Sequence, residues 1–320
     1  MSAASHAKTN QQKTHNTMAF DITALPAYVE QRNSELVYKA VIDAPTIERI
    51  GKQLGVKGTS AINRLNTNPT FQSGKNCGFE AEGDAVLSQR NIVTGLVKVN
   101  MEFCPETLIG TYAEYQVRYE AGRETMPFEE RIVEDIIRNV NAQLETAVWQ
   151  GDTTSNNSNL AQFDGFVKVI GAASGTVPVS VAAGTSAWDA IKATYLAIPE
   201  AVLSKGDVKI FVSPAIYREF TQDLVAKNFF AYAGPQDEYP EEIIFPGTNV
   251  AIARTPGLSG VKKIYAGSAA NFVFGTDMLD GKETFDLWYS QDNQSFRLAI
   301  KFNAGVQVVF PDEVVVATLA

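Results

Sequence analysis

Histidine is almost absent from this chain of 320 residues. The only two histidines, His6 and His15, both lie in a polar N-terminal segment. Chemistry in the rest of the chain must therefore work without imidazole, which excludes Ser-His-Asp and Cys-His catalytic arrangements and the usual zinc sites with histidine ligands. The two cysteines, Cys77 and Cys104, have neither the spacing nor the neighbours of a metal site or a redox pair.

Long apolar runs and an excess of positive charge are also missing. No stretch approaches the roughly 18 apolar residues of a membrane helix, and residues 1–18 lack the apolar core of a signal peptide. We therefore expect a cytosolic protein that is neither inserted in a membrane nor secreted. The formal net charge of −9 repels polyanions, which argues against tight, sequence-independent binding of nucleic acid by the body of the protein.

Motifs for catalysis or nucleotide binding are absent as well. The sequence contains no GxGxxG after a strand, no GxxxxGK[ST], no GxSxG and no calcium loop of EF-hand spacing. Adjacent acids such as Glu129 and Glu130 are more typical of a solvated surface, in a chain with 36 acidic residues, than of a catalytic carboxylate pair. The sequence predicts no catalytic residue, no cofactor and no metal site.

One long amphipathic helix is the clearest element that the sequence does contain. Pro127 suits a first helical turn, and Gly151 is a natural stop. Apolar residues between them recur every four positions, which predicts a helix of about 35 Å with one apolar face over residues 127–150. Its predicted core positions are Ile132, Ile136, Val140, Leu144 and Val148.

An arm, two short helices and an extended segment precede this helix. The polar residues 1–18 cannot form a core, so they are either a loose tail or an arm that orders against a neighbouring subunit. Pro26 and Pro45 each begin a helical stretch, the second covering PTIERIGKQLG. No helical period survives over 56–103, and VKVNMEF at its end alternates like a strand, so we interpret 56–103 as a long projecting hairpin.

A compact α/β unit follows the long helix. LAQFDGFVKVI (160–170) reads as a strand with a glycine hinge. Ser186 and Asp189 form the pattern of a capping box and begin a helix. The strand VKIFV comes next, and Ser213, followed by proline, begins another helix.

The last third of the chain combines an aromatic loop with long strands. Residues 228–247 are rich in both aromatic and acidic side chains and are a candidate contact surface. Apolar residues alternate over 284–290 and 295–302, which predicts a hairpin of two long strands. Two further extended runs, VQVVF and VVVATL, end the chain.

The arm, hairpin, long helix and aromatic loop lack partners inside one subunit, which favours a stable oligomer. From Ala19 onward their order resembles the major capsid protein of tailed bacteriophages, the Hong-Kong-phage capsid fold. AVWQGD, a polar loop and FDGF resemble the turn after the spine helix of that family. The closing run FDLWYSQDNQSFRLAIKFNAGVQVVFPDEVVV is similar to its returning strands.

This resemblance implies an α+β fold with an N-terminal arm, an extended E-loop hairpin, a P-domain with a long spine helix and a β-sheet, and a compact A-domain. The implied division is 1–55 for the arm and short helices, 56–103 for the E-loop, 104–185 for the P-domain with its spine helix at 127–150, 186–277 for the A-domain, and 278–320 for the returning P-domain strands and a C-terminal A-domain strand. We expect the spine helix to pack on the returning strands near Leu287 and Leu298, with Glu130, Glu134 and Arg138 facing solvent or the next subunit.

The implied function is structural rather than enzymatic. The resemblance implies hexamers and pentamers of an icosahedral virion shell around double-stranded DNA, assembled in the cytoplasm of a bacterial host. The implied partners are other copies of the chain, scaffold and portal proteins, decoration proteins as a further class, and weakly contacted DNA. Candidate interface residues are Arg64, Phe71, Lys75, Phe79 and Arg90 in the hairpin and Phe229, Phe230, Tyr232 and Tyr239 in the aromatic loop.

Two alternatives remain at the level of sequence. One is an encapsulin-type compartment, which shares the fold and encloses enzymes. The other is a hydrolase without histidine, which would need a concave pocket with two convergent carboxylates.

Overall fold

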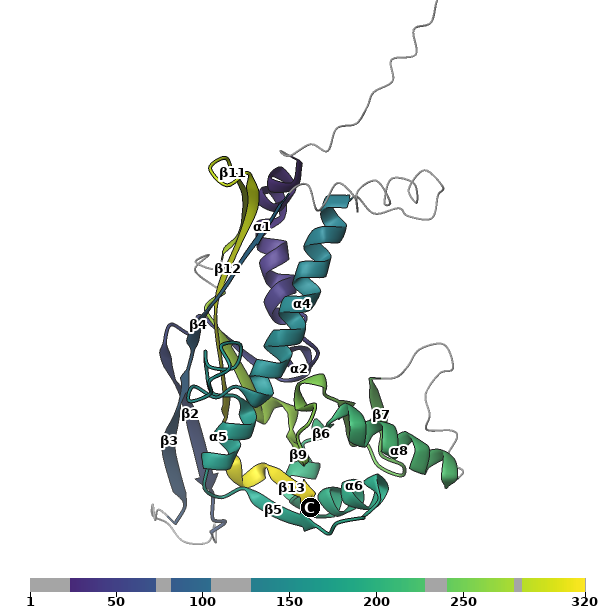
Figure 1. Cartoon of the computed structure of the whole chain (residues 1–320). Helices are drawn as coiled ribbons and strands as arrows, with labels where there is room; N and C mark the ends of the chain where they lie inside the picture. Colours follow the sequence, from purple (N-terminus) through teal and green to yellow (C-terminus); the bar gives the residue numbers. More distant parts are fainter. Residues whose placement is uncertain (1–23, 73–81, 105–127, 228–240, 279–283, 320) are drawn as a thin grey trace, which may run out of the picture.

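Two sheets, each with its own hydrophobic core, organise the computed structural model, and a separate two-stranded hairpin lies beside them (Figure 1). The structure describes residues 24–72, 82–104, 128–227, 241–278 and 284–319. Its helices are α1 (Ala24–Ile42), α2 (Pro45–Arg49), α4 (Phe128–Gln150), α5 (Phe166–Ala172), α6 (Ala187–Leu196), α7 (Glu200–Leu203) and α8 (Pro214–Ala226), with 3-10 turns η2 (Pro256–Leu258), η3 (Ala269–Asn271) and η4 (Pro311–Glu313). Its strands are β1 (Gly51–Leu54), β2 (Thr59–Asn68), β3 (Asp84–Val93), β4 (Gly95–Phe103), β5 (Val177–Val181), β6 (Val208–Val212), β7 (Glu242–Ile244), β8 (Ala251–Arg254), β9 (Lys263–Ser268), β10 (Phe272–Thr276), β11 (Thr284–Ser290), β12 (Ser295–Val308) and β13 (Val315–Leu319).

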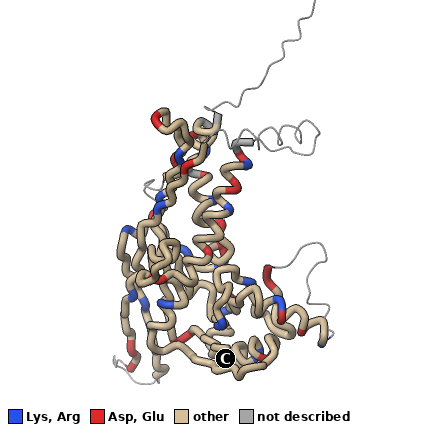
Figure 2. Tube along the Cα trace, in the orientation of Figure 1, with Lys and Arg blue, Asp and Glu red and all other residues tan. Residues whose placement is uncertain are grey.

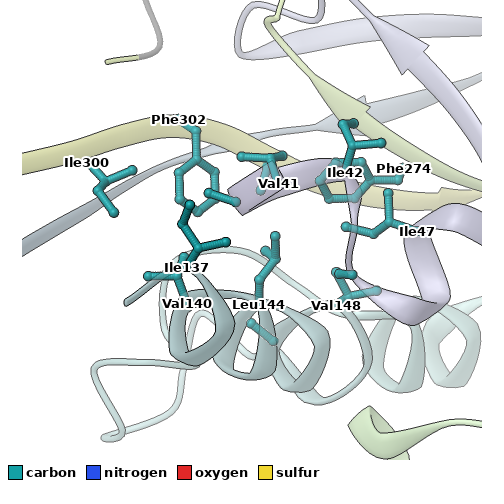
Figure 3. Packing of buried hydrophobic residues seen from close by; sticks show 14 of the residues in the cluster. Val41, Ile42, Ile47, Ile137, Val140, Leu144, Val148, Phe274, Ile300 and Phe302 are labelled. Atoms are coloured by element: carbon teal, nitrogen blue, oxygen red, sulfur yellow. The ribbon is translucent and has the colours of Figure 1, made fainter. Parts of the chain in front are cut away.

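The first sheet is built around β12. This strand pairs antiparallel with β11, β4 and β10, and β1 adds to β10 in parallel, giving five strands. The apolar stripe of α4 meets this sheet and α1: Ile137, Val140 and Leu144 point toward Ile300 and Phe302 in Figure 3. A single core therefore joins the helices and the sheet.

The second sheet has six strands in the order β5-β13-β9-β6-β8-β7, with helices α6 and α8 packed in its core. The predicted capping box starts α6, because the Ser186 hydroxyl accepts a hydrogen bond from the Asp189 backbone N–H at 3.2 Å. Ser213 caps α8 in the same way, with Pro214 in the first turn. These helix starts and the strand VKIFV, now β6, are confirmed.

Two predicted segments differ from the structure. Residues 166–172 form the helix α5 rather than a strand, because Phe166 and Ile170, four residues apart, are both buried against the first core. The helix that begins at Pro45 ends at Arg49, and β1 pairs with β10 instead of continuing it. Sheet pairing overrides local helix propensity here.

The predicted hairpin over 56–103 is too long. Only β2 and β3 pair with each other, from Thr59 opposite Val93 to Asn68 opposite Asp84. The alternating strand β4 pairs with β12 over its whole length, since its apolar face completes the first core. Gly305 of β12 lies at the base of the hairpin, where a Cβ would be 2.3 Å from the Val93 carbonyl oxygen. The close approach of these two backbones requires glycine.

The expected surroundings of the long helix need a correction as well. Helix α1 packs against both α4 and β11, so it lies between them (Figure 1). Glu130 is expected from the sequence to face solvent or the next subunit. Instead its carboxylate pairs with Arg32 of α1 in the same chain, at 3.1 Å. Arg138 is exposed and pairs with Asp135 on the same helix. In the described ranges, no helix combines the length and the apolar character of a membrane span.

Candidate interaction surfaces

The β2–β3 hairpin presents two chemically different faces. Its pairing register places Leu65 directly opposite Leu87 on the face turned away from the body. Their side chains are 63% and 66% exposed. Beside them the Gln89 side-chain amide donates to the Asn63 side-chain oxygen at 2.9 Å, which holds the two strands in register. This outer face therefore exposes an apolar pair on an ordered surface.

The inner face attaches the hairpin to the body. Ile92 is fully buried over Gly275, where a Cβ would be 2.6 Å from the Ile92 Cδ1 atom. The Gln307 side-chain amide of β12 donates to the Asn91 carbonyl at 2.6 Å. Farther out, the Arg64 guanidinium lies 4.7 Å from the centre of the Phe310 ring. A hairpin of two strands is marginally stable alone, so these contacts fix its direction.

The hairpin candidates of the sequence fall into three groups. Arg64 and Arg90 lie together on the inner face, half-buried. Phe71 is fully exposed near the end of β2. Lys75 and Phe79 lie outside the described residues, as do the four loop candidates Phe229, Phe230, Tyr232 and Tyr239. Their role in contacts stays a prediction.

The predicted core positions of α4 lie where the periodicity places them. Ile136, Val140, Leu144 and Val148 are buried, and Ile132 packs at the edge of the same core. Figure 3 shows Val140, Leu144 and Val148 pointing toward Phe302, Phe274 and Ile47.

Sequence reasoning missed a buried carboxylate in the same helix. Glu145 is 1% exposed, beside the apolar stripe and one turn before Trp149. Its carboxylate accepts hydrogen bonds from the backbone N–H of Thr46 at 2.9 Å, from the Thr46 hydroxyl, and from the backbone N–H of Gly257. Burial raises the pKa of Glu145, and these hydrogen bonds oppose that rise. The side chain thereby ties α2 and η2 to α4.

The end of α4 is also where the two cores meet. The Trp149 ring lies 5.2 Å from Phe166, 5.3 Å from Phe211 and 5.4 Å from Tyr265, measured between ring centres. Phe211 and Tyr265 belong to strands of the second sheet. The Trp149 N–H donates to the Thr46 hydroxyl at 2.8 Å, so the aromatic cluster and the Glu145 hydrogen bonds form one junction.

A groove of about 470 Å³ runs between α1 and α4, lined partly by carboxylates. Of these, Glu130 pairs with Arg32, and Glu145 accepts hydrogen bonds from Thr46 and Gly257. Asp43 and Glu134 are the other two acids of the lining. Within the described ranges, no three Asp, Glu, His or Cys side chains are grouped so that they could hold a metal ion. Charges of both signs are interspersed along the described trace in Figure 2.

Comparison with known proteins identifies the fold. No protein-family model matches the chain, and no curated protein sequence does. Solved structures do match over nearly the whole length. The structure of the satellite phage P4 procapsid including the size determination protein has a TM-score of 0.58 at 13% identity, covering 89% of this chain and 90% of that one. Gordonia phage Cozz gives 0.54 at 14% identity, covering 87% and 86%.

A third match is the virus-like particle from Pyrococcus furiosus, with a TM-score of 0.51 at 11% identity, covering 91% of this chain and 99% of that one. At these identities the likeness establishes the fold. The chain has the α+β fold of tailed-phage major capsid proteins, as the sequence resemblance predicts.

Proposed function

We propose that this chain is a major capsid protein: the repeated subunit of a closed icosahedral shell, arranged in hexamers and pentamers around double-stranded DNA. The observation that carries the proposal is the fold likeness to phage capsid structures over nearly nine-tenths of the chain, 89% and 87% in the two matches. It accounts for features that a monomer does not use, above all the exposed Leu65–Leu87 pair on an ordered hairpin.

The parts of the chain receive mechanical roles in this proposal. The β2–β3 hairpin is the E-loop and contacts a neighbouring copy through its outer face. The first sheet with α4 is the P-domain, which forms the rigid wall of the shell. The second sheet with α6 and α8 is the A-domain, which packs around the axes of hexamers and pentamers.

The remaining partners follow from the same proposal. A scaffold protein and a portal protein would assist assembly in the host cytoplasm, and decoration proteins would bind the finished virion. The acidic chain would contact packaged DNA weakly, because a net charge of −9 opposes tight binding of phosphate. The role is structural, not enzymatic.

The experiment compares the full chain with a variant that lacks the hairpin. Residues 62–90 are replaced by an Asn-Gly turn, which keeps Ile92 in the core and lets Ser60 still pair with it. We expect the full chain to form particles visible by electron microscopy, and the variant to remain a folded subunit that forms none. A full chain that stays a 34.8 kDa monomer under every assembly condition would refute the proposal.

A second candidate is an encapsulin-type shell that encloses enzymes, and the likeness to the virus-like particle from Pyrococcus furiosus favours it. Particle diameter and the ratio of nucleic-acid to protein absorbance separate the two. A capsid isolated from its host contains DNA, whereas an enzyme compartment contains protein.

A further inference from the structure

The inner face of the hairpin carries two arginines, Arg64 and Arg90, of which only Arg64 has an ion pair in the described part of the chain, at 3.9 Å to Asp312. Ile62 is opposite Arg90 and Arg64 is opposite Ser88, so Arg64 and Arg90 are diagonal neighbours on one face, about 7–8 Å apart. Both side chains are half-buried. Two guanidinium groups on neighbouring positions of one face, shielded from water, repel each other unless an anion lies beside them.

The nearby carboxylates are insufficient. Glu313 is engaged by Lys205, whose ammonium lies 2.7 Å from the carboxylate. Asp312 is 3.9 Å from the nearest Arg64 nitrogen, too far for a hydrogen bond, and is itself mostly exposed. Two cations lie over the Phe310 ring, with Arg64 at 4.7 Å and Lys205 at 5.6 Å from its centre.

The hydrogen-bonding capacity of the two guanidinium groups is also unused. The Nε atom of Arg64 is buried without an acceptor. Arg90 takes part in no hydrogen bond or ion pair within the described part of the chain. Burial, and next the charge of Arg64, lower the pKa of Arg90, and no carboxylate offsets them. Arginine is suited to bidentate pairing with a carboxylate, and in the described part of the chain this pair has only the 3.9 Å contact of Arg64 with Asp312.

We propose that the Arg64–Arg90 pair is half of an ion cluster that a carboxylate of a second copy of this chain completes on assembly. This inference rests on the proposed function. A second copy fits better than nucleic acid, because the chain carries 36 acidic residues against 27 basic ones, so that a second copy brings carboxylates to the pair while the net charge of −9 repels a polyanion. Closing the cluster would hold the hairpin and the neighbouring copy in one register.

This arrangement predicts effects of opposite sign for one substitution. Arg90→Met removes a charge that costs free energy in the isolated subunit, so its melting temperature should rise by about 1–3 °C. The same change leaves the partner carboxylate without its cation, so the threshold concentration for assembly should rise about tenfold or more. Arg90→Lys keeps the charge but not the bidentate geometry, so its threshold concentration for assembly should lie between those of wild type and Arg90→Met.

The control is Arg138→Met, because Arg138 is exposed and already paired with Asp135 in its own chain. It should change neither quantity. A lower melting temperature for Arg90→Met would mean that the arginine is satisfied within its own subunit, and assembly at the wild-type threshold would remove the second-copy carboxylate. Particles that form normally but retain less nucleic acid would assign the anion to phosphate instead. Failure of the wild-type chain to assemble would overturn both this inference and the proposed function, whereas an assembling wild type with an indifferent Arg90→Met overturns the inference alone.

Discussion

Glu145 in α4 and Arg90 in β3 are both charged residues held away from water, yet the chain treats them differently. The Glu145 carboxylate is almost fully buried and accepts three hydrogen bonds, whereas the half-buried Arg90 guanidinium has no described acceptor. The apolar residues follow the same division: those of α4 are covered within the subunit, and Leu65 and Leu87 of the hairpin are not. The junction around α4 is therefore complete in one chain, whereas the proposed function gives the hairpin its partner in a second one.

The largest effect is expected from breaking the complete region. Replacing Ile136 and Val140 together by Asp would bury two unpaired charges, each costing several kcal/mol, and should unfold the subunit. Circular dichroism and size-exclusion chromatography would detect the loss of structure. Asn139→Asp, on the exposed side of the same helix, is the matched control and should remain folded. A soluble, assembling double variant would contradict the assignment of this face to the core.

Local sequence pattern predicted the complete region better than the incomplete one. The four-residue spacing from Ile132 to Val148 identified the core face of α4, and Ser186 and Ser213 identified two helix starts, because these signals depend only on neighbours in sequence. The pairing of β4 with β12 and of β1 with β10 was missed, because partners distant in sequence decide which strands meet.

The sites divide in the same way. Arg64 and Arg90 could be chosen from the sequence as interface candidates, but their position on one inner face required the register of the hairpin. Glu145 was missed, because a glutamate beside an apolar stripe is ordinarily solvated. Its burial depends on Thr46 and Gly257, which come from distant parts of the chain. The only hint in the sequence is that Glu145 lies one turn before Trp149.

A smaller effect on stability is expected at the Glu145 junction. Glu145→Gln replaces one acceptor oxygen by a donor and leaves a backbone N–H of Thr46 or Gly257 unpaired, which should cost about 1–3 kcal/mol.

The pH dependence of that cost has a defined sign. The folded-state pKa of Glu145 is raised above the ordinary value of 4.5, so the folded state binds the proton more tightly than the unfolded state. The stability from this group is fully present below the unfolded pKa and is lost as the pH rises through the folded pKa. The advantage of wild type over Glu145→Gln should therefore shrink as the pH rises from about 4.5. Denaturant unfolding at several pH values measures it, and an advantage that grows with pH would contradict the burial argument.

The smallest effect on the subunit is expected from the outer face of the hairpin. Leu65→Ser with Leu87→Ser exchanges exposed apolar side chains for polar ones, so each change should alter the free energy of unfolding by no more than about 0.5 kcal/mol. Assembly should nevertheless be lost, because the pair would no longer bury apolar surface against a neighbouring copy. Electron microscopy and light scattering would measure this loss of assembly.

Leu96 of β4 provides the matched control for that pair. It is 64% exposed and lies outside the hairpin, in the first sheet, so Leu96→Ser should leave both stability and assembly intact. If the hairpin variant lost stability instead, its outer face would already be covered within the subunit, and the contrast with α4 would disappear. If the control variant also failed to assemble, exposed leucines in general, rather than the hairpin in particular, would drive association. Loss of assembly in the hairpin variant alone, with both subunits equally stable, would assign the missing partner surface to this face.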